Sequence, residues 1–236
     1  MNFSKVQQFI FEKLQEQPQR SVASLIRGEL RKRGFRKSYS SFLQKDKMKP
    51  RIVYIHGNGA SHWSFGWAKW FKEELEKRGY ETFFETMPDS VIARKKFWFP
   101  FLENHIKAGE GDVLVGWSSG AIAAMRYAET HKIKGSVLIG PSSSDLGDEL
   151  EKQSGYFDTP WQWQKIKENQ EHVAMVYSDD DPFIPQEQFA IVEEELHPDE
   201  VLKFSGRGHF IDEATFPELL DYILRTYPIS FRHFAK

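Results

Sequence analysis

The sequence predicts an α/β fold in which a mainly parallel sheet carries helices on both faces. From residue 49 onward, short apolar segments without polar alternation recur along the chain, which is typical of strands that are buried on both faces. Helical patterns separate these segments, as in the crossover connections of parallel sheets. A chain of 236 residues is long enough to form one such domain with a small appendage.

The predicted elements alternate in the order that this fold requires. We expect strands at residues 51–56, 81–86, 112–115, 136–139, 172–177 and 200–204. We expect helices at residues 67–77, 90–106, 121–131, 186–196 and 214–225, with a bend or a break at Pro100 in the second. Residues 141–170 do not follow the alternation, so we interpret them as an insertion beside the sheet.

The first 48 residues differ from the rest of the chain in charge and in pattern. Residues 1–49 carry 12 lysines and arginines against 4 acidic residues, although the formal net charge of the whole chain is −2. Apolar residues recur there at helical spacing in two stretches. We therefore divide the chain into a basic helical N-terminal extension, residues 1–48, and a main domain, residues 49–236. The extension is a candidate docking segment for a protein or nucleic-acid partner, and a solvated helix face is the simpler interpretation of its charges.

The overall composition narrows the class of protein. A net charge near zero argues against a surface built for nucleic acid or for anionic lipid. The chain has no cysteine, which excludes disulfides, cysteine nucleophiles and thiolate metal sites. No apolar run reaches the roughly 20 residues that span a bilayer, and the N-terminus has no signal-peptide pattern. We therefore expect a cytoplasmic protein that does not associate with membranes.

A candidate nucleophile lies in the stretch Gly116-Trp117-Ser118-Ser119-Gly120, which follows a predicted strand. The pattern G-x-S-x-G between a strand and a helix forms a sharp turn that presents the middle serine above the sheet. Only small residues fit two positions before and two positions after that serine. Both positions are glycines if Ser118 is central, whereas Trp117 would clash if Ser119 were central. We therefore assign Ser118 as the nucleophile.

A serine nucleophile needs an acid and a histidine base from later strand ends, in the order serine, acid, histidine. His209 follows the last predicted strand, in the glycine-rich loop Gly206–Phe210. Asp179, Asp180 and Asp181 follow the strand before it. Asp181 precedes a proline that restrains its backbone, so we prefer Asp181 as the acid and rank Asp180 second. A calcium loop does not match, because its alternating oxygen ligands and central glycine are missing. We expect no metal and no cofactor.

The oxyanion hole is expected to use backbone N–H groups from two turns. Ser119 directly follows the nucleophile and supplies the first N–H group. Asn58, in the turn His56–Gly59 after the first strand, supplies the second, with Gly59 as the alternative. A dinucleotide-binding pattern fails at this turn because His62 replaces the last glycine.

With these residues assigned, the chain resembles the α/β-hydrolase fold and, within it, the retinoblastoma-binding protein 9 and YdeN-like serine hydrolase family. The resemblance runs from residue 51 to residue 226. It implies a triad of Ser118, Asp181 and His209 and a compact hydrolase with little or no lid. The matching segments, in chain order, are Gly57–Gly59, Met87–Asp89, Ala93-Arg94, Ser118–His131, Ser144–Glu149, Ser154–Phe157, Pro160–Trp163, Asp180–Phe183 and Gly208–Phe210.

Two features depart from this family. The Leu-x-Cys-x-Glu motif for retinoblastoma-type pocket proteins would fall at Ile106–Glu110, where both the leucine and the cysteine are missing. We therefore do not expect binding to retinoblastoma-type proteins. The second departure is the basic N-terminal extension, which the compact family members lack.

These residues predict a serine hydrolase that cleaves ester or amide bonds of small apolar or aromatic acyl substrates through an acyl-enzyme intermediate. The alternative is an interaction protein in which the extension docks a partner and the triad is vestigial or secondary, and the intact set of three groups argues against it. Several aromatic residues near the strand ends are candidates for the substrate pocket, although aromatic side chains are also ordinary core residues. They are Trp63, Trp67, Trp117, Trp161 and Phe183.

Overall fold

The computed structural model describes residues 50–229. At its centre is a six-stranded sheet with the strand order β2-β1-β3-β4-β5-β6, and every neighbouring pair is parallel. The predicted parallel sheet is therefore confirmed, whereas the predicted extension, residues 1–48, lies outside the described residues. The strands are β1 (Arg51–Ile55), β2 (Glu81–Phe84), β3 (Asp112–Trp117), β4 (Gly135–Ile139), β5 (His172–Ser178) and β6 (Glu200–Phe204).

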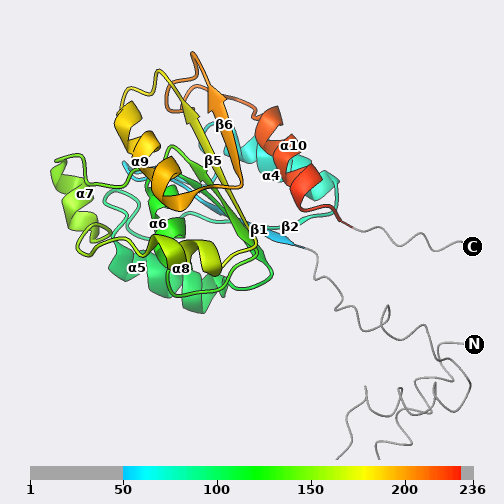
Figure 1. Ribbon diagram of the computed structural model, residues 1–236. Helices are drawn as coiled ribbons and strands as arrows, with labels where there is room; N and C mark the ends of the chain where they lie inside the picture. The colour runs from blue at the N-terminus through cyan, green and yellow to red at the C-terminus, as the bar shows by residue number, and fades with distance from the viewer. Residues whose placement is uncertain (1–49, 230–236) are drawn as a thin grey trace, which may run out of the picture. The chain divides into compact units, whose positions relative to one another are not determined.

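Helices cover both faces of the sheet (Figure 1), and each face has its own buried apolar cluster. One face is covered by α4 (Ala68–Lys77) and α10 (Pro217–Thr226), which contact each other. The other face is covered by α5 (Lys95–Pro100), α6 (Ser119–Ala128), α8 (Trp163–Glu168) and α9 (Gln186–Leu196). No helix in residues 50–229 combines the length and the apolar character that crossing a bilayer requires.

The helix expected at residues 90–106 is shorter than the pattern predicted. Ala93 has a positive φ of 62° and Arg94 is extended, so the helix begins only at Lys95. The α-helix ends at Pro100, where a bend or a break was expected, and the chain continues directly as the π-helix η1 (Phe101–Ile106).

Residues 141–170, which were interpreted as an insertion beside the sheet, instead connect the neighbouring parallel strands β4 and β5. This segment, for which we keep the name insertion, contains the short helix α7 (Glu149–Ser154) as well as α8, which covers the sheet. The side chain of Arg126 on α6 fixes this insertion to the domain. Its guanidinium lies 3.6 Å from the ring centroid of Trp161 and pairs with Glu129 at 2.6 Å. It also donates to three backbone carbonyls of the insertion, those of Tyr156, Thr159 and Pro160. These partners compensate the buried cation and hold the insertion in one position.

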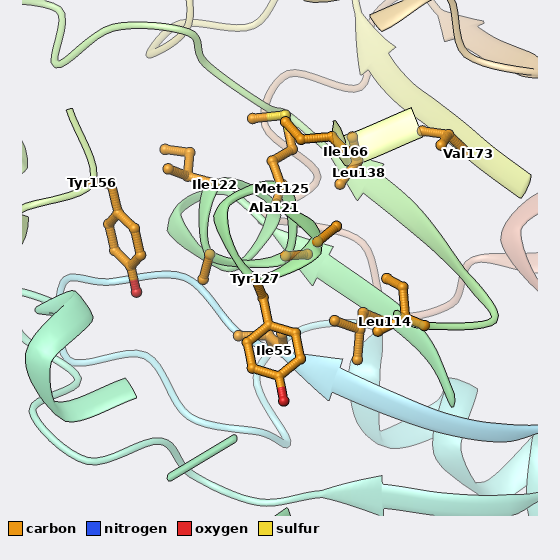
Figure 2. Close-up of a cluster of buried hydrophobic side chains, with 14 of the residues drawn as sticks. Ile55, Leu114, Ala121, Ile122, Met125, Tyr127, Leu138, Tyr156, Ile166 and Val173 are labelled. Carbon is orange, nitrogen blue, oxygen red and sulfur yellow. The ribbon is translucent and has the colours of Figure 1, made fainter. Parts of the chain in front are cut away.

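Helix α6 is the central element of the core, because all ten of its residues are buried. Its side chains therefore pack against both the sheet and the insertion. Figure 2 shows this arrangement, in which the α6 residues Ala121, Ile122, Met125 and Tyr127 lie among Ile55 and Leu114 of the sheet and Tyr156 of the insertion.

The start of α6 approaches β1 so closely that no side chain fits between them. A Cβ atom on Gly120 would lie 2.0 Å from the carbonyl oxygen of Ile55 and 2.8 Å from that of His56. A Cβ atom on Gly116 would lie 2.3 Å from the carbonyl oxygen of Gly120. In both cases the obstacle is backbone, which cannot rotate away as a flexible side chain can.

Gly120→Ala is therefore expected to lower the free energy of unfolding by about 3 kcal/mol or more, because the added methyl group forces the backbone of α6 away from β1. Urea unfolding followed by tryptophan fluorescence measures this change. Gly109→Ala is the matched control, since a Cβ atom there meets nothing within 4 Å, and its effect should stay below about 0.5 kcal/mol. Equal unfolding midpoints for the two variants would contradict the close approach.

Candidate active site

The residues that the sequence singled out lie in loops at one edge of the sheet. In a parallel sheet the carboxyl ends of all strands meet at the same edge, where ligands of such folds bind. The turns after β1, β3, β5 and β6 carry Asn58, Ser118, Asp181 and His209, respectively.

Ser118 occupies the strained turn between β3 and α6. Its backbone angles are φ 57° and ψ −122°, a conformation that non-glycine residues rarely adopt. Its N–H group donates to the carbonyl oxygen of Ile139 at the end of β4 (2.8 Å), which holds the turn in place. The side chain is partly exposed, and its hydroxyl makes no hydrogen bond within residues 50–229. No residue of the described part of the chain therefore holds this hydroxyl.

His209 and Asp181 form a buried pair. Nδ1 of His209 lies 2.7 Å from Oδ2 of Asp181, and the two side chains are 5% and 0% exposed. The other carboxylate oxygen of Asp181 accepts from the N–H groups of Phe183 and Ile184. Because the carboxylate accepts, Nδ1 donates, and Nε2 of His209 is left to accept a proton.

Asp180 binds a different set of groups from Asp181. Its Oδ1 atom accepts from the hydroxyl of Ser178 (2.5 Å) and from the N–H groups of Arg207 (3.1 Å) and Gly208 (3.0 Å). The Ser178 hydroxyl, followed by the Gly208 N–H group, holds the pKa of Asp180 below its usual value. Asp180 thus ties the loop after β6 to the loop after β5, and only Asp181 contacts His209.

Aromatic and cationic contacts fix the loop that carries His209. The indole N–H of Trp117 donates to the carbonyl oxygen of His209 (3.0 Å). The guanidinium of Arg207 lies 4.6 Å from the ring centroid of Phe204 and 4.5 Å from that of Phe216. Arg207 also pairs with Glu213. These contacts restrict the positions that the imidazole can adopt.

Gly140 lets the His209 ring approach the end of β4. A Cβ atom on Gly140 would lie 2.9 Å from Cε1 of His209, so no side chain fits there. The residue before it, Ile139, accepts the N–H group of Ser118. Ser118 therefore contacts Ile139, and His209 lies against the next residue, Gly140, so the end of β4 brings the two residues near each other.

The backbone N–H groups of Asn58 and Ser119 have no backbone acceptor within residues 50–229. Ser119 is also the first residue of α6, where the helix dipole favours negative charge. The N–H group of Gly59, the alternative donor, is engaged with the carbonyl oxygen of Val91 (3.1 Å). The geometry therefore favours Asn58 over Gly59.

His56 fixes the turn after β1, a role that the sequence analysis did not assign. The N–H group of Met87 donates to Nε2 of this buried ring (2.8 Å), so Nδ1 carries the proton and donates to the carbonyl oxygen of Gly57 (2.7 Å). Burial lowers the pKa of His56, which keeps the ring neutral. The sequence shows a histidine at the end of the first strand, but a histidine at that position is compatible with several different roles.

Two of the five candidate pocket residues lie beside His209. The ring centroid of Phe183 is 5.4 Å from that of His209, and the ring centroid of Trp117 is 5.6 Å from it. Phe183 is 59% exposed, so its apolar surface is available to a ligand.

The other three candidate pocket residues pack against other parts of the domain. Trp67 is buried among Tyr54, Phe71 and Phe216, so it belongs to the core and its assignment to the pocket was wrong. Trp161 stacks on Trp163 and supports the guanidinium of Arg126. Trp63 packs against the core under the ammonium group of Lys72.

One acidic residue that was not among the candidates, Glu151, also lies beside the proposed oxyanion hole. Glu151 on α7 lies within hydrogen-bond distance of Asn58 and Ser119. The sequence contains no signal of this contact, because the position of Glu151 depends on how the insertion packs against the turn after β1. In residues 50–229 no group of three or more histidine, aspartate or glutamate side chains is arranged to hold a metal ion.

Comparison with known proteins places the chain in a family. A family model described as serine hydrolase matches residues 52–223. Serine hydrolase RBBP9 of Rattus norvegicus is 43% identical over 175 residues, which cover 72% of this chain and 91% of that protein. The matched region contains every candidate site residue described above.

Solved structures share the fold. The ydeN gene product of Bacillus subtilis superposes with a TM-score of 0.68 at 22% identity, covering 75% of this chain and 98% of that chain. Est1E from Butyrivibrio proteoclasticus superposes with a TM-score of 0.56 at 15% identity, covering 78% of this chain and 87% of that chain. At these identities the likeness shows the fold alone, which is the compact α/β-hydrolase fold. The chain is an enzyme of this fold and belongs to the RBBP9/YdeN-like serine hydrolase family.

Proposed function

We propose that this hydrolase cleaves ester or amide bonds by acyl transfer to Ser118, with His209 as the base and Asp181 as its orienting acid. The observation that carries the proposal is the buried 2.7 Å contact between His209 and Asp181, which lies beside the strained turn of Ser118. A serine hydroxyl becomes a useful nucleophile only when a base takes its proton. The membership of the serine hydrolase family supports the same assignment.

The proposed reaction has two halves. Nε2 of His209 takes the proton from Ser118 as the hydroxyl oxygen attacks the substrate carbonyl, and the N–H groups of Asn58 and Ser119 donate to the resulting oxyanion. Asp181 holds the imidazole tautomer and stabilises the imidazolium. His209 then gives the proton to the leaving alcohol or amine, which departs and leaves an acyl-enzyme. Water attacks this ester in the same way, and the acid and free Ser118 are released.

The surface around these loops supports an apolar acyl group. Two exposed aromatic side chains, those of Phe183 and Phe65, lie beside the loop of His209. The ring centroid of Phe183 is 5.4 Å from that of His209, and Phe65 stacks on Trp117, whose indole N–H group donates to the carbonyl oxygen of His209. Apolar rims of this kind bind apolar or aromatic groups and leave the few polar atoms to orient the carbonyl.

A fluorophosphonate probe is expected to label the native protein on Ser118, because the activated hydroxyl attacks the phosphorus. Peptide mass spectrometry distinguishes Ser118 from Ser119. The heat-denatured protein and the Ser118→Ala variant should not be labelled, and Ser118→Ala should lose on the order of 10⁴ to 10⁶ in kcat. Equal labelling of Ser118→Ala would disprove the assignment.

A panel of p-nitrophenyl esters tests the acyl preference. Acetate, butyrate and phenylacetate esters should exceed hemisuccinate and palmitate esters by about tenfold or more in kcat/KM, because the apolar rim leaves a charged acyl group without partners and suits a short acyl chain. Initial rates of p-nitrophenol release measure this ratio. A preference for the charged or long-chain esters would refute the proposed substrate class.

A further inference from the structure

Glu151 lies in the first turn of α7, and its side chain is not needed to cap this helix. The N-cap residue Asp148 accepts from the N–H groups of Leu150 and Glu151. In a capping box the third helical residue reaches back to the N-cap N–H group. Here that N–H group already donates to the carbonyl oxygen of Asp145 (2.9 Å). The carboxyl group of Glu151 can therefore bind residues outside α7.

This carboxyl group contacts the side chains of both residues that are proposed to form the oxyanion hole. Its Oε1 atom accepts from Nδ2 of Asn58 at 2.7 Å and lies 3.4 Å from the hydroxyl oxygen of Ser119. Asn58 follows β1, whereas Ser119 follows β3. One oxygen atom thus joins two turns that come from different strands.

The other carboxyl oxygen, Oε2, is buried and has no hydrogen-bond partner within residues 50–229. Burial raises the pKa of Glu151, and the nearby charges of Asp148 and Asp145 act in the same direction, although the bond from Asn58 opposes them. Burial thus makes this carboxyl group a weaker acid than a solvated glutamate, and its Oε1 atom accepts from Asn58 in either protonation state.

We propose that Glu151 is a positioning residue of the reaction: it fixes the turns of Asn58 and Ser119 relative to each other and so sets the spacing of the two oxyanion donors. This inference rests on the proposed function. Oxyanion donors act only when they lie about 2.7–3.1 Å from the developing charge, and a displacement of about 1 Å can cost roughly 10²-fold in rate. The insertion thereby contributes to catalysis without contacting the reacting atoms.

Steady-state hydrolysis of p-nitrophenyl butyrate tests this role in three variants of the full chain. Glu151→Ala removes the acceptor and should lower kcat by about 30-fold to 100-fold, with KM changed by less than about threefold, because the donors act on the transition state rather than on the bound ester. Glu151→Gln keeps an acceptor oxygen for Asn58 and should retain kcat within about threefold. Glu149→Gln removes an exposed charge from the same helix and should match the wild type.

Thermal unfolding and the extent of fluorophosphonate labelling show whether each variant is folded and has a reactive Ser118. If Glu151→Ala does not fold, Asn58→Ala removes the same link from the other side and keeps the backbone N–H group; it should then lower kcat by about tenfold or more.

The outcomes separate the two proposals. Unchanged kcat in a folded, labelled Glu151→Ala or Asn58→Ala variant overturns the positioning role and leaves the proposed function intact. A loss in Glu151→Gln as large as that in Glu151→Ala also overturns it, since the charge rather than the acceptor would then matter. Absence of labelling at Ser118 in the wild type overturns the proposed function itself.

Discussion

The close contact between the start of α6 and the end of β1 is the constraint on which the rest of the site depends. Gly120 faces the carbonyl oxygen of Ile55 with no room for a single carbon atom. This contact places the first turn of α6 directly above the sheet. The backbone must then turn sharply at Ser118, whose positive φ raises the side chain out of the sheet edge. The same packing places Ser119 beside the turn after β1, where Glu151 contacts both Ser119 and Asn58.

The loops around this turn are held by one another as well as by the sheet. Asp180 joins the loops after β5 and β6, Arg207 packs on aromatic side chains, and Trp117 binds the carbonyl oxygen of His209. Such contacts restrict the imidazole before any substrate arrives, which is the requirement for preorganised catalysis. Each of these contacts uses a particular side chain, so the arrangement depends on Asp180, Trp117 and Arg207 as well as on the fold of the loops.

Much of the fold could be predicted because its signals are local. The four inner strands are buried on both faces and appear as apolar runs, and each of the six predicted strands overlaps a strand of the structure. The candidate serine could be separated from its neighbour because glycine spacing is a steric rule that applies within five residues. The choice of Asp181 over Asp180 followed from the proline after it, and the structure brings Asp181 to His209.

The features that escaped prediction depend on contacts between distant segments. The late start of α5 follows from the backbone of Ala93 and Arg94, which no periodicity reveals. Trp67 fits a pocket or a core equally well until its neighbours are known. The need for glycine at Gly140 arises from the ring of His209, 69 positions later in the chain, and the role of Glu151 arises from the return of the insertion to the turn after β1.

In the proposed reaction Asp181 orients His209 for its action on Ser118, and the kcat of Asp181→Asn measures this role. An asparagine keeps the shape of the side chain but can hold the imidazole in the wrong tautomer. The exposed neighbour Asp179 provides the matched control as Asp179→Asn. Asp181→Asn is expected to lower kcat by about 10⁴-fold, whereas Asp179→Asn should leave it near the wild-type value. A kcat for folded Asp181→Asn within about tenfold of the wild type would show that Asp181 does not orient His209.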